Sequence, residues 1–199
     1  MNTPSKEELI ALIKTVLPEK RFQHTLMVEK EALYLASLLE LSNTEEISFA
    51  SLLHDITKPL TFNEHREIIK NLSEDDLKSP EVLHALSGSI KATEMGFSKG
   101  IASMIESHTT AKPDMTLSEE IIFVADYTEE TRTHEACLKE RERLHKELLE
   151  SDSEKRKEIL KKSVKRILES TVEYLNKKDS FIHPRTLLAL DFLSEHKED

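Results

Sequence analysis

Hydrophobic residues recur at the helical period along nearly the whole chain, and no stretch alternates as a strand does. Residues 19–41 show the pattern clearly, because one stripe of that stretch runs through His24, Val28, Ala32, Leu35 and Leu39. Further stretches of the same kind cover 5–17, 43–56, 79–95, 98–108 and 116–130. The pattern therefore predicts an all-α protein.

Signals for helix ends support these boundaries. Ser5 is followed three residues later by Glu8, which is the signature of a capping box. Asn43 or Thr44 can cap the helix over 43–56, and Pro59 is expected to end it. We expect a helix from about residue 5 and a break just after residues 54–58.

The character of the chain changes after residue 134. Residues 135–178 are dense in charge and carry leucines and isoleucines sparsely at helical spacing, which predicts two amphipathic helices broken near 151–153. These helices either form an arm that binds a partner or pack one stripe on the body, and the second interpretation is favoured because such stripes are common. The length of 199 residues suits one domain over 1–199, with a core over about 6–134 and the charged helices of about 135–193 packed on it.

Composition excludes several classes of protein. Three glycines are too few for a phosphate loop or a dinucleotide-binding fold. A net charge of −10 argues against a nucleic-acid partner, which requires a basic surface. Cys137 is the single cysteine, so a disulfide framework or a thiolate metal cage is not expected. No window reaches eighteen apolar residues, so we expect no membrane partner and a cytoplasmic location.

Strong metal ligands fall on the apolar stripes at six positions: His24, His54, Asp55, His84, His108 and Asp126. A buried carboxylate is costly unless it is paired or bound to a metal, and no Arg or Lys is expected on these stripes. Imidazole and carboxylate together suit Fe, Mn, Co or Zn rather than Mg alone. Six ligands are too many for one tetrahedral site. They predict two metals bridged by Asp55, although a single histidine of this kind is more often a core residue.

The order of these six residues resembles the metal signature of the HD-domain phosphohydrolases, and "LLHDITK" at 52–58 resembles their His-Asp motif. Residues 21–28, 108–132 and 182–193 resemble segments of the YqeK family, bacterial HD-domain hydrolases that split diadenosine tetraphosphate symmetrically. The resemblance spans about residues 6–193. It implies an HD-domain helical bundle with additional C-terminal helices, two bound metal ions and two ADP molecules as products. Iron is the implied metal, with manganese as the alternative.

The sequence departs from the family at a few positions. Ala111 stands where the family usually has glycine, and "ADYTEETR" at 125–132 replaces its usual Ala-Asp-Lys-Ile-Glu-Pro-Gly-Arg. The spacing from Asp126 to Glu129 and Arg132 is kept, so we expect the metal site to be retained. The changes at 127, 128, 130 and 131 put the substrate preference in question instead.

Candidate catalytic residues are Asp55, Lys58 and Arg132, and candidate substrate contacts are Lys58, Thr109 and Arg132. Lys58 can neutralise phosphate charge, or it is an exposed lysine near a helix C-terminus. Arg132 can clamp a phosphate or pair with a neighbouring glutamate, and Thr109 can bind substrate or cap a turn. Arg21 is expected to brace the first helix, and a ligand carboxylate of the metal site can serve as its partner.

The other histidines receive structural interpretations. Their sequence neighbours are charged and predict exposure for His65, His134, His145 and His196. His183 precedes Pro184, which favours an extended turn and a structural role.

Two alternatives remain beside symmetric hydrolysis of dinucleoside polyphosphates. One is an HD-type nucleotidase or phosphodiesterase that acts on a different nucleotide. The other is a helical module that senses nucleotides without turnover. The charged C-terminal helices also leave a homodimer open.

Overall fold

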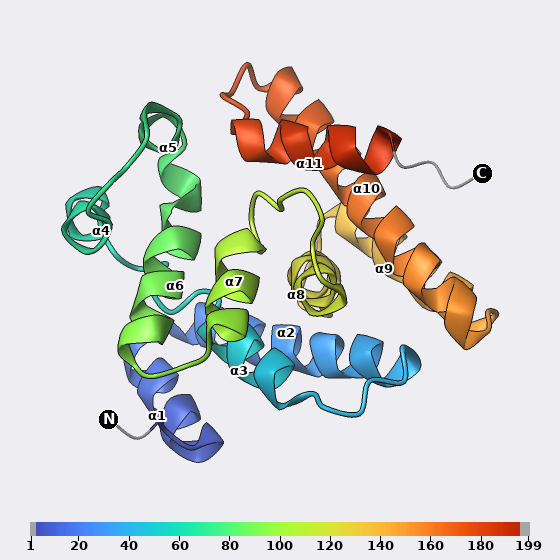
Figure 1. Cartoon of the computed structure of the whole chain (residues 1–199), viewed down its shortest axis with the longest axis horizontal. Helices are drawn as coiled ribbons and strands as arrows, with labels where there is room; N and C mark the ends of the chain where they lie inside the picture. Colours follow the sequence, from blue (N-terminus) through green and yellow to red (C-terminus); the bar gives the residue numbers. More distant parts are fainter. Residues whose placement is uncertain (1–2, 196–199) are drawn as a thin grey trace.

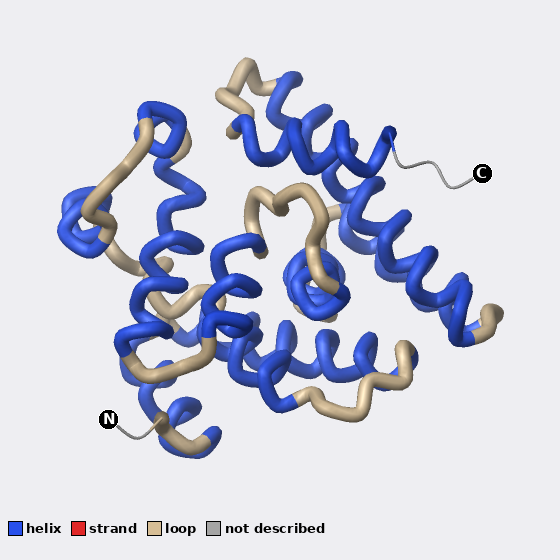
Figure 2. The backbone as a smooth tube through the Cα atoms, viewed as in Figure 1, coloured by secondary structure: helices blue, strands red, loops and turns tan. Residues whose placement is uncertain are grey.

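The computed structural model describes residues 3–195, and this part of the chain folds into eleven α-helices and one 3-10 helix without a strand (Figures 1 and 2). The all-α prediction is confirmed. The helices are α1 (Lys6–Val16), α2 (Glu19–Leu38), α3 (Glu45–Leu53), α4 (Phe62–Ile68), α5 (Glu74–Lys78), η1 (Pro80–Val82), α6 (Leu83–Glu94), α7 (Lys99–Ser107), α8 (Leu117–Thr128), α9 (Glu135–Leu149), α10 (Ser153–Lys177) and α11 (Pro184–Glu195). His196 lies outside the described residues.

Helix ends agree with the local chemistry of the sequence. The Ser5 hydroxyl accepts a hydrogen bond from the backbone N–H of Glu8 at 3.2 Å, and the Glu8 carboxylate accepts one from Ser5 N–H at 2.8 Å. This confirms the predicted capping box. Thr44 is the N-cap residue of α3 but makes no side-chain capping bond.

The third helix ends earlier than the pattern predicts. α3 stops at Leu53, and tight turns follow in which Ile56 N–H donates to Leu53 O at 3.0 Å and Lys58 N–H donates to Asp55 O at 2.9 Å. Pro59, which favours an early end to the helix, follows these turns. His54 and Asp55 therefore lie at a helix end and in a turn, so their side chains need not follow one helical face.

Two short helices, α4 and α5, were not predicted. Each is too short to show an apolar stripe, although each begins with a capping box, at Thr61 and at Ser73. In Figure 1 both lie at the upper left, beside α6.

The core combines the N-terminal and C-terminal helices. Figure 1 shows α2 and α3 along one side, α7 and α8 above them, and α9 and α10 on the flank of α8. One buried apolar cluster joins residues of α1 to α3 and α6 to α8 with Leu144, Leu148, Leu160, Val164 and Leu168. The charged helices thus pack one stripe on the body, and the extent of the domain over 1–199 stays a prediction. Among the described residues, no helix is both long enough and apolar enough to cross a membrane.

Candidate metal centre

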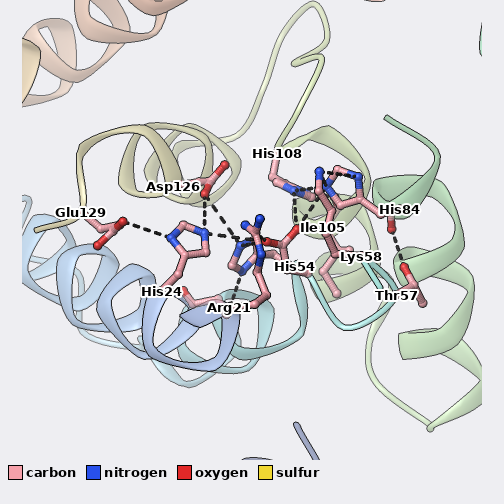
Figure 3. Close-up of polar contacts among 12 residues, drawn as sticks. Arg21, His24, His54, Thr57, Lys58, His84, Ile105, His108, Asp126 and Glu129 are labelled. Carbon is pink, nitrogen blue, oxygen red and sulfur yellow. Dashed lines mark hydrogen bonds and ion pairs between the residues drawn. The ribbon is translucent and has the colours of Figure 1, made fainter. Parts of the chain in front are cut away.

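The six predicted ligand residues come together from five parts of the fold. His24 projects from α2, His54 and Asp55 follow α3, His84 lies at the start of α6, and His108 directly follows α7. Asp126 completes the set from the last turns of α8, and Figure 3 shows its side chain converging with those of the four histidines. All are buried except Asp126, whose side chain is 20% exposed.

Asp55 lies between two pairs of histidines. We call His24 and His54, together with Asp55, the first ligand group, and His84 and His108, together with Asp55, the second. Its Oδ2 is 3.7 Å from Nε2 of His24 and 3.4 Å from Nε2 of His54. Its Oδ1 is 3.2 Å from Nε2 of His84 and 3.9 Å from Nε2 of His108. Within each group the ligand atoms lie within 4.8 Å of one another, which is compatible with one metal ion per group. The two oxygens of Asp55 therefore face different groups, as a bridging carboxylate requires.

Asp126 adds a further donor to the first group. Its Oδ1 lies 3.0 Å from Nε2 of His24 and 3.8 Å from Nε2 of His54. The first group thus offers two imidazoles and two carboxylates, and the second offers two imidazoles and the shared carboxylate.

The other ring nitrogen of each histidine is occupied by an oxygen acceptor. Nδ1 contacts Glu129 Oε1 at 3.0 Å in His24, Ser51 O at 2.6 Å in His54, Glu81 O at 2.8 Å in His84 and Ile105 O at 2.6 Å in His108. Because these oxygens only accept, Nδ1 carries the hydrogen and Nε2 directs its lone pair toward the centre.

This tautomer leaves lone pairs that need a cation. Nε2 of His24 and Nε2 of His54 are buried and have no hydrogen-bond partner among the described residues. The lone pair of His24 faces the acceptor Oδ1 of Asp126 at 3.0 Å, and two acceptors this close require a proton or a metal ion between them. The donor set of imidazoles and carboxylates fits divalent metal ions.

The pKa shifts favour the protonation states that bind metal, which are neutral imidazole and ionised carboxylate, for most of these residues. Burial lowers the pKa of His108 to about 3 and also lowers that of His84. Burial by itself would raise the pKa of Asp55, but His54 and His84 hold it well below its usual range. His24 differs, since burial lowers its pKa but the carboxylates of Asp126 and Glu129 raise it overall. The field at His24 therefore attracts positive charge.

Two arginines reach the site carboxylates, although no Arg or Lys was expected on the apolar stripes themselves. Arg21 Nη1 donates to Asp55 Oδ2 at 2.7 Å, and Arg132 Nη2 donates to Asp126 Oδ1 at 2.5 Å. The helical stripe did not reveal these contacts because long side chains reach across from neighbouring turns. The pairing of Arg21 with a site carboxylate is as expected. The carboxylates are therefore paired, and the case for a metal rests instead on Nε2 of His24 and Nε2 of His54, which have no hydrogen-bond partner among the described residues.

Lys58 contacts the second group. Its Nζ lies 3.1 Å from Nδ1 and 3.2 Å from Nε2 of His84, so it lies over the ring, and burial lowers its pKa. Lys58 is thus not the freely exposed lysine of the alternative interpretation.

Thr109 follows His108, but its hydroxyl makes no hydrogen bond to any of the six residues. Its hydroxyl is buried without a partner among the described residues and lines a narrow recess beside Thr110. Its role in substrate binding stays a prediction.

The altered residues of the 127–131 segment mostly point away from the centre. The Tyr127 hydroxyl lies 3.3 Å from Ser170 Oγ of α10, and Glu130 pairs with Lys30 at the surface. Thr128 is buried and donates to Val124 O of its own helix at 2.9 Å. Only Thr131 acts near the centre, because its hydroxyl donates to Glu129 at 2.7 Å.

The sequence analysis did not assign two residues near the centre the positions that they take in the structure. Glu129 is completely buried and holds the ring of His24, and its position three residues after Asp126 was the available signal. His65 was predicted to be exposed, which is wrong, because it is only 5% exposed. Its helix α4 was itself not predicted, so its buried face gave no signal.

Three further histidines were predicted from their sequence neighbours to be exposed or structural. His134 is exposed as expected, whereas His145 is partly buried and contacts Glu31 at 2.7 Å. His183 is buried against Asp76 at 3.2 Å, which agrees with a structural role.

A separate hollow of about 420 Å³ lies between α6 and the start of α11. Leu86 and Ile90 line it from a face of α6 that differs from the face of His84. The hollow contains none of the six ligand residues, so the chemistry is assigned to the His-Asp cluster.

Comparisons with known proteins agree with this geometry. The sequence model of the HD domain family matches residues 21–131. A symmetrical bis(5′-nucleosyl)-tetraphosphatase of Halalkalibacterium halodurans is 32% identical over 92% of this chain and 94% of its own length. A protein of the same name from Staphylococcus aureus is 29% identical over 96% of each chain.

A solved structure shows the same fold. It is a Clostridium acetobutylicum protein described as a predicted HD superfamily hydrolase involved in NAD metabolism. It superposes with a TM-score of 0.87 and 29% identity, and the match covers 98% of this chain and 100% of that one. The chain therefore belongs to the HD domain family and, within it, to the YqeK family of hydrolases.

Proposed function

We propose that this protein hydrolyses diadenosine tetraphosphate and related dinucleoside tetraphosphates at the middle anhydride, which gives two nucleoside diphosphates. The single observation that carries the proposal is the pair of ligand groups that share Asp55. The names of the relatives from two organisms support the substrate class. The 127–131 segment does not argue against it, because three of its four altered side chains point away from the centre.

In this proposal the metal ligands are divided between two ions. His24, His54, Asp55 and Asp126 hold the first, and Asp55, His84 and His108 hold the second. Bound divalent ions of this kind lower the pKa of a water molecule and polarise a phosphoryl oxygen. We propose iron as the native metal with manganese as the alternative, since both accept mixed imidazole and carboxylate ligands.

The protein's own side chains supply orientation and charge. The Nδ1–H contacts to Glu129, Ser51, Glu81 and Ile105 keep the four imidazoles in one tautomer. Arg132 lies on the first group and Lys58 on the second, so a polyphosphate across the centre meets a cation at either side. Hydrolysis adds one water molecule across the central P–O–P linkage and releases ADP twice.

The test is product analysis with metal-loaded protein. Protein loaded with Fe²⁺ or Mn²⁺ is expected to convert diadenosine tetraphosphate to ADP alone, as measured by chromatography. Asp55→Asn is expected to abolish turnover, whereas Glu130→Gln, a surface change, keeps it. AMP together with ATP would indicate a different cleavage position. Two bound metals without turnover on this substrate would favour another nucleotide or a sensing module.

The metal content of protein purified without oxygen tests the choice of iron.

A homodimer through the charged helices and a cytoplasmic location stay predictions.

A further inference from the structure

His65 is a buried histidine for which the proposed chemistry has no use. It projects from α4, and its Nδ1 lies 2.8 Å from the hydroxyl of Ser87 in α6. Burial lowers its pKa, which favours the neutral ring near neutral pH. A neutral ring with a hydrogen on Nδ1 can donate to Ser87.

The contact continues from Ser87 toward the centre. Ser87 Oγ donates to Thr57 Oγ1 at 2.9 Å, with the carbonyl of Leu83 as a second acceptor at 3.0 Å. Whichever acceptor takes this hydrogen, Ser87 Oγ remains free to accept from His65. Thr57 in turn donates to the backbone oxygen of His84 at 2.8 Å, as Figure 3 shows. We call His65, Ser87 and Thr57 the His65 network.

The network joins the two halves of the second ligand group. Thr57 lies two residues after Asp55 in the same turn. His84 lies in the first turn of α6. Asp55 Oδ1 and His84 Nε2 face each other at 3.2 Å, so their separation depends on how α6 sits against this turn.

Gly88 shows how closely α6 approaches the turn. A Cβ atom at this position would lie 3.5 Å from Thr57 Oγ1, 3.6 Å from the backbone oxygen of His54 and 3.2 Å from a methyl group of Ile105. With helix and turn this close, a shift of α6 moves His84 relative to Asp55 directly.

We propose that His65 is a positioning residue for the metal centre, which acts through Ser87 and Thr57 to hold His84 in register with Asp55. The inference rests on the proposed two-metal centre. Contacts behind metal ligands of this kind typically change metal affinity by about 10- to 100-fold when they are removed.

The experiment compares variants of the network with a matched serine. Ser87→Ala breaks the contacts of Ser87 with His65 and Thr57, and His65→Leu breaks the contact of His65 with Ser87. Both leave Thr57 with its bond to the backbone oxygen of His84 but weaken the support behind it. His65→Asn keeps a donor near the position of Nδ1. Ser107→Ala is the control, because Ser107 is also completely buried, also donates to a backbone oxygen four residues earlier at 2.8 Å, and precedes His108. Mn²⁺ titration is expected to show about 10- to 100-fold weaker binding of one of the two ions in Ser87→Ala and His65→Leu. Ser107→Ala and His65→Asn are expected to bind both ions as the wild type does.

A second measurement does not depend on metal. In metal-free protein, the amides of the first turns of α6 are expected to exchange hydrogen several-fold faster in Ser87→Ala and His65→Leu than in Ser107→Ala. If the wild type binds fewer than two ions, the proposed two-metal centre fails, and the exchange rates still decide whether the network holds α6. Ion binding and exchange rates in Ser87→Ala equal to those of Ser107→Ala would overturn the proposal.

Discussion

Glu129 is the side chain that orients His24, and its effect can be separated from metal ligation. It accepts the Nδ1–H of His24 at 3.0 Å and is itself held by the N–H of Thr131 at 2.5 Å. Glu129→Gln keeps an oxygen that can accept from the ring but removes the negative charge. We expect Mn²⁺ affinity to fall about tenfold, the lower end of such effects. Isothermal titration measures this, with Glu130→Gln as the surface control, and equal affinities in the two variants would contradict the assigned role.

Arg132 makes two contacts with one residue, which a lysine cannot reproduce. Its Nε donates to the backbone oxygen of Asp126 at 2.8 Å and its Nη2 donates to the carboxylate at 2.5 Å. In Arg132→Lys, a single ammonium replaces the planar fork. We expect kcat/KM for diadenosine tetraphosphate to fall by about tenfold or more, equivalent to about 1.4 kcal/mol. Steady-state kinetics test this against Arg143→Lys, which changes a surface pair, and an unchanged kcat/KM would exclude Arg132 from substrate binding.

The sequence revealed the six converging residues because each lies on or beside an apolar stripe of a helix that was predicted. It did not reveal the burial of His65, since this depends on which helices become neighbours. Glu129 lies between the two cases. Its spacing from Asp126 was noticed, but its complete burial follows only from the packing of α8 against α2.

At the scale of elements, α8 carries a buried carboxylate away from the centre. Glu120 is 8% exposed, and burial raises its pKa to about 7, although Lys161 opposes the shift. In the unfolded chain a glutamate titrates near pH 4.3. Between about pH 4.3 and 7 the folded state therefore holds a proton that the unfolded state has lost, so this residue makes stability fall as pH rises.

Glu120→Gln should remove this dependence. Relative to the wild type, we expect the free energy of unfolding of the variant to increase between pH 5 and pH 8 by up to about 3 kcal/mol. Urea denaturation at the two pH values measures the difference. Glu142→Gln, on the exposed side of α9, changes the net charge equally and should show no comparable change. An equal response of both variants would mean that Glu120 is ionised in the folded protein at low cost.

Long helices were predictable, and short ones were not. The break between α9 and α10 near residues 151–153 is confirmed, because two long stripes and the N-cap Asp152 define it. α4 and α5 have seven and five residues, which is too few for a period to show, so packing against neighbouring elements rather than pattern determines them. The early end of α3 has the same origin, since hydrogen bonds of the following turns compete with the helical ones.

At the scale of the whole molecule, the ligand residues come from the region between α2 and α8, whereas α9 and α10 contribute none. These C-terminal helices nevertheless share the apolar cluster, with Leu144 and Leu160 completely buried in it. If the chain is one domain, as predicted, metal binding stabilises α10 as much as α2, because no part unfolds alone. If the C-terminal helices fold separately, metal leaves their unfolding unchanged.

We expect a single thermal transition that Mn²⁺ moves as a whole. One site filled at a hundred times its Kd adds about 2.7 kcal/mol, which raises the Tm of a chain of this size by roughly 5–11 °C. Calorimetry with Mn²⁺ or with a chelator measures the shift, and Asp55→Asn should lose most of it because both ligand groups use that carboxylate. Hydrogen exchange in α10 should slow on metal addition together with exchange in α2. A second transition whose temperature does not change on addition of Mn²⁺ would instead indicate a domain boundary near residue 134. The charged helices would then be free to act as the partner-binding arm.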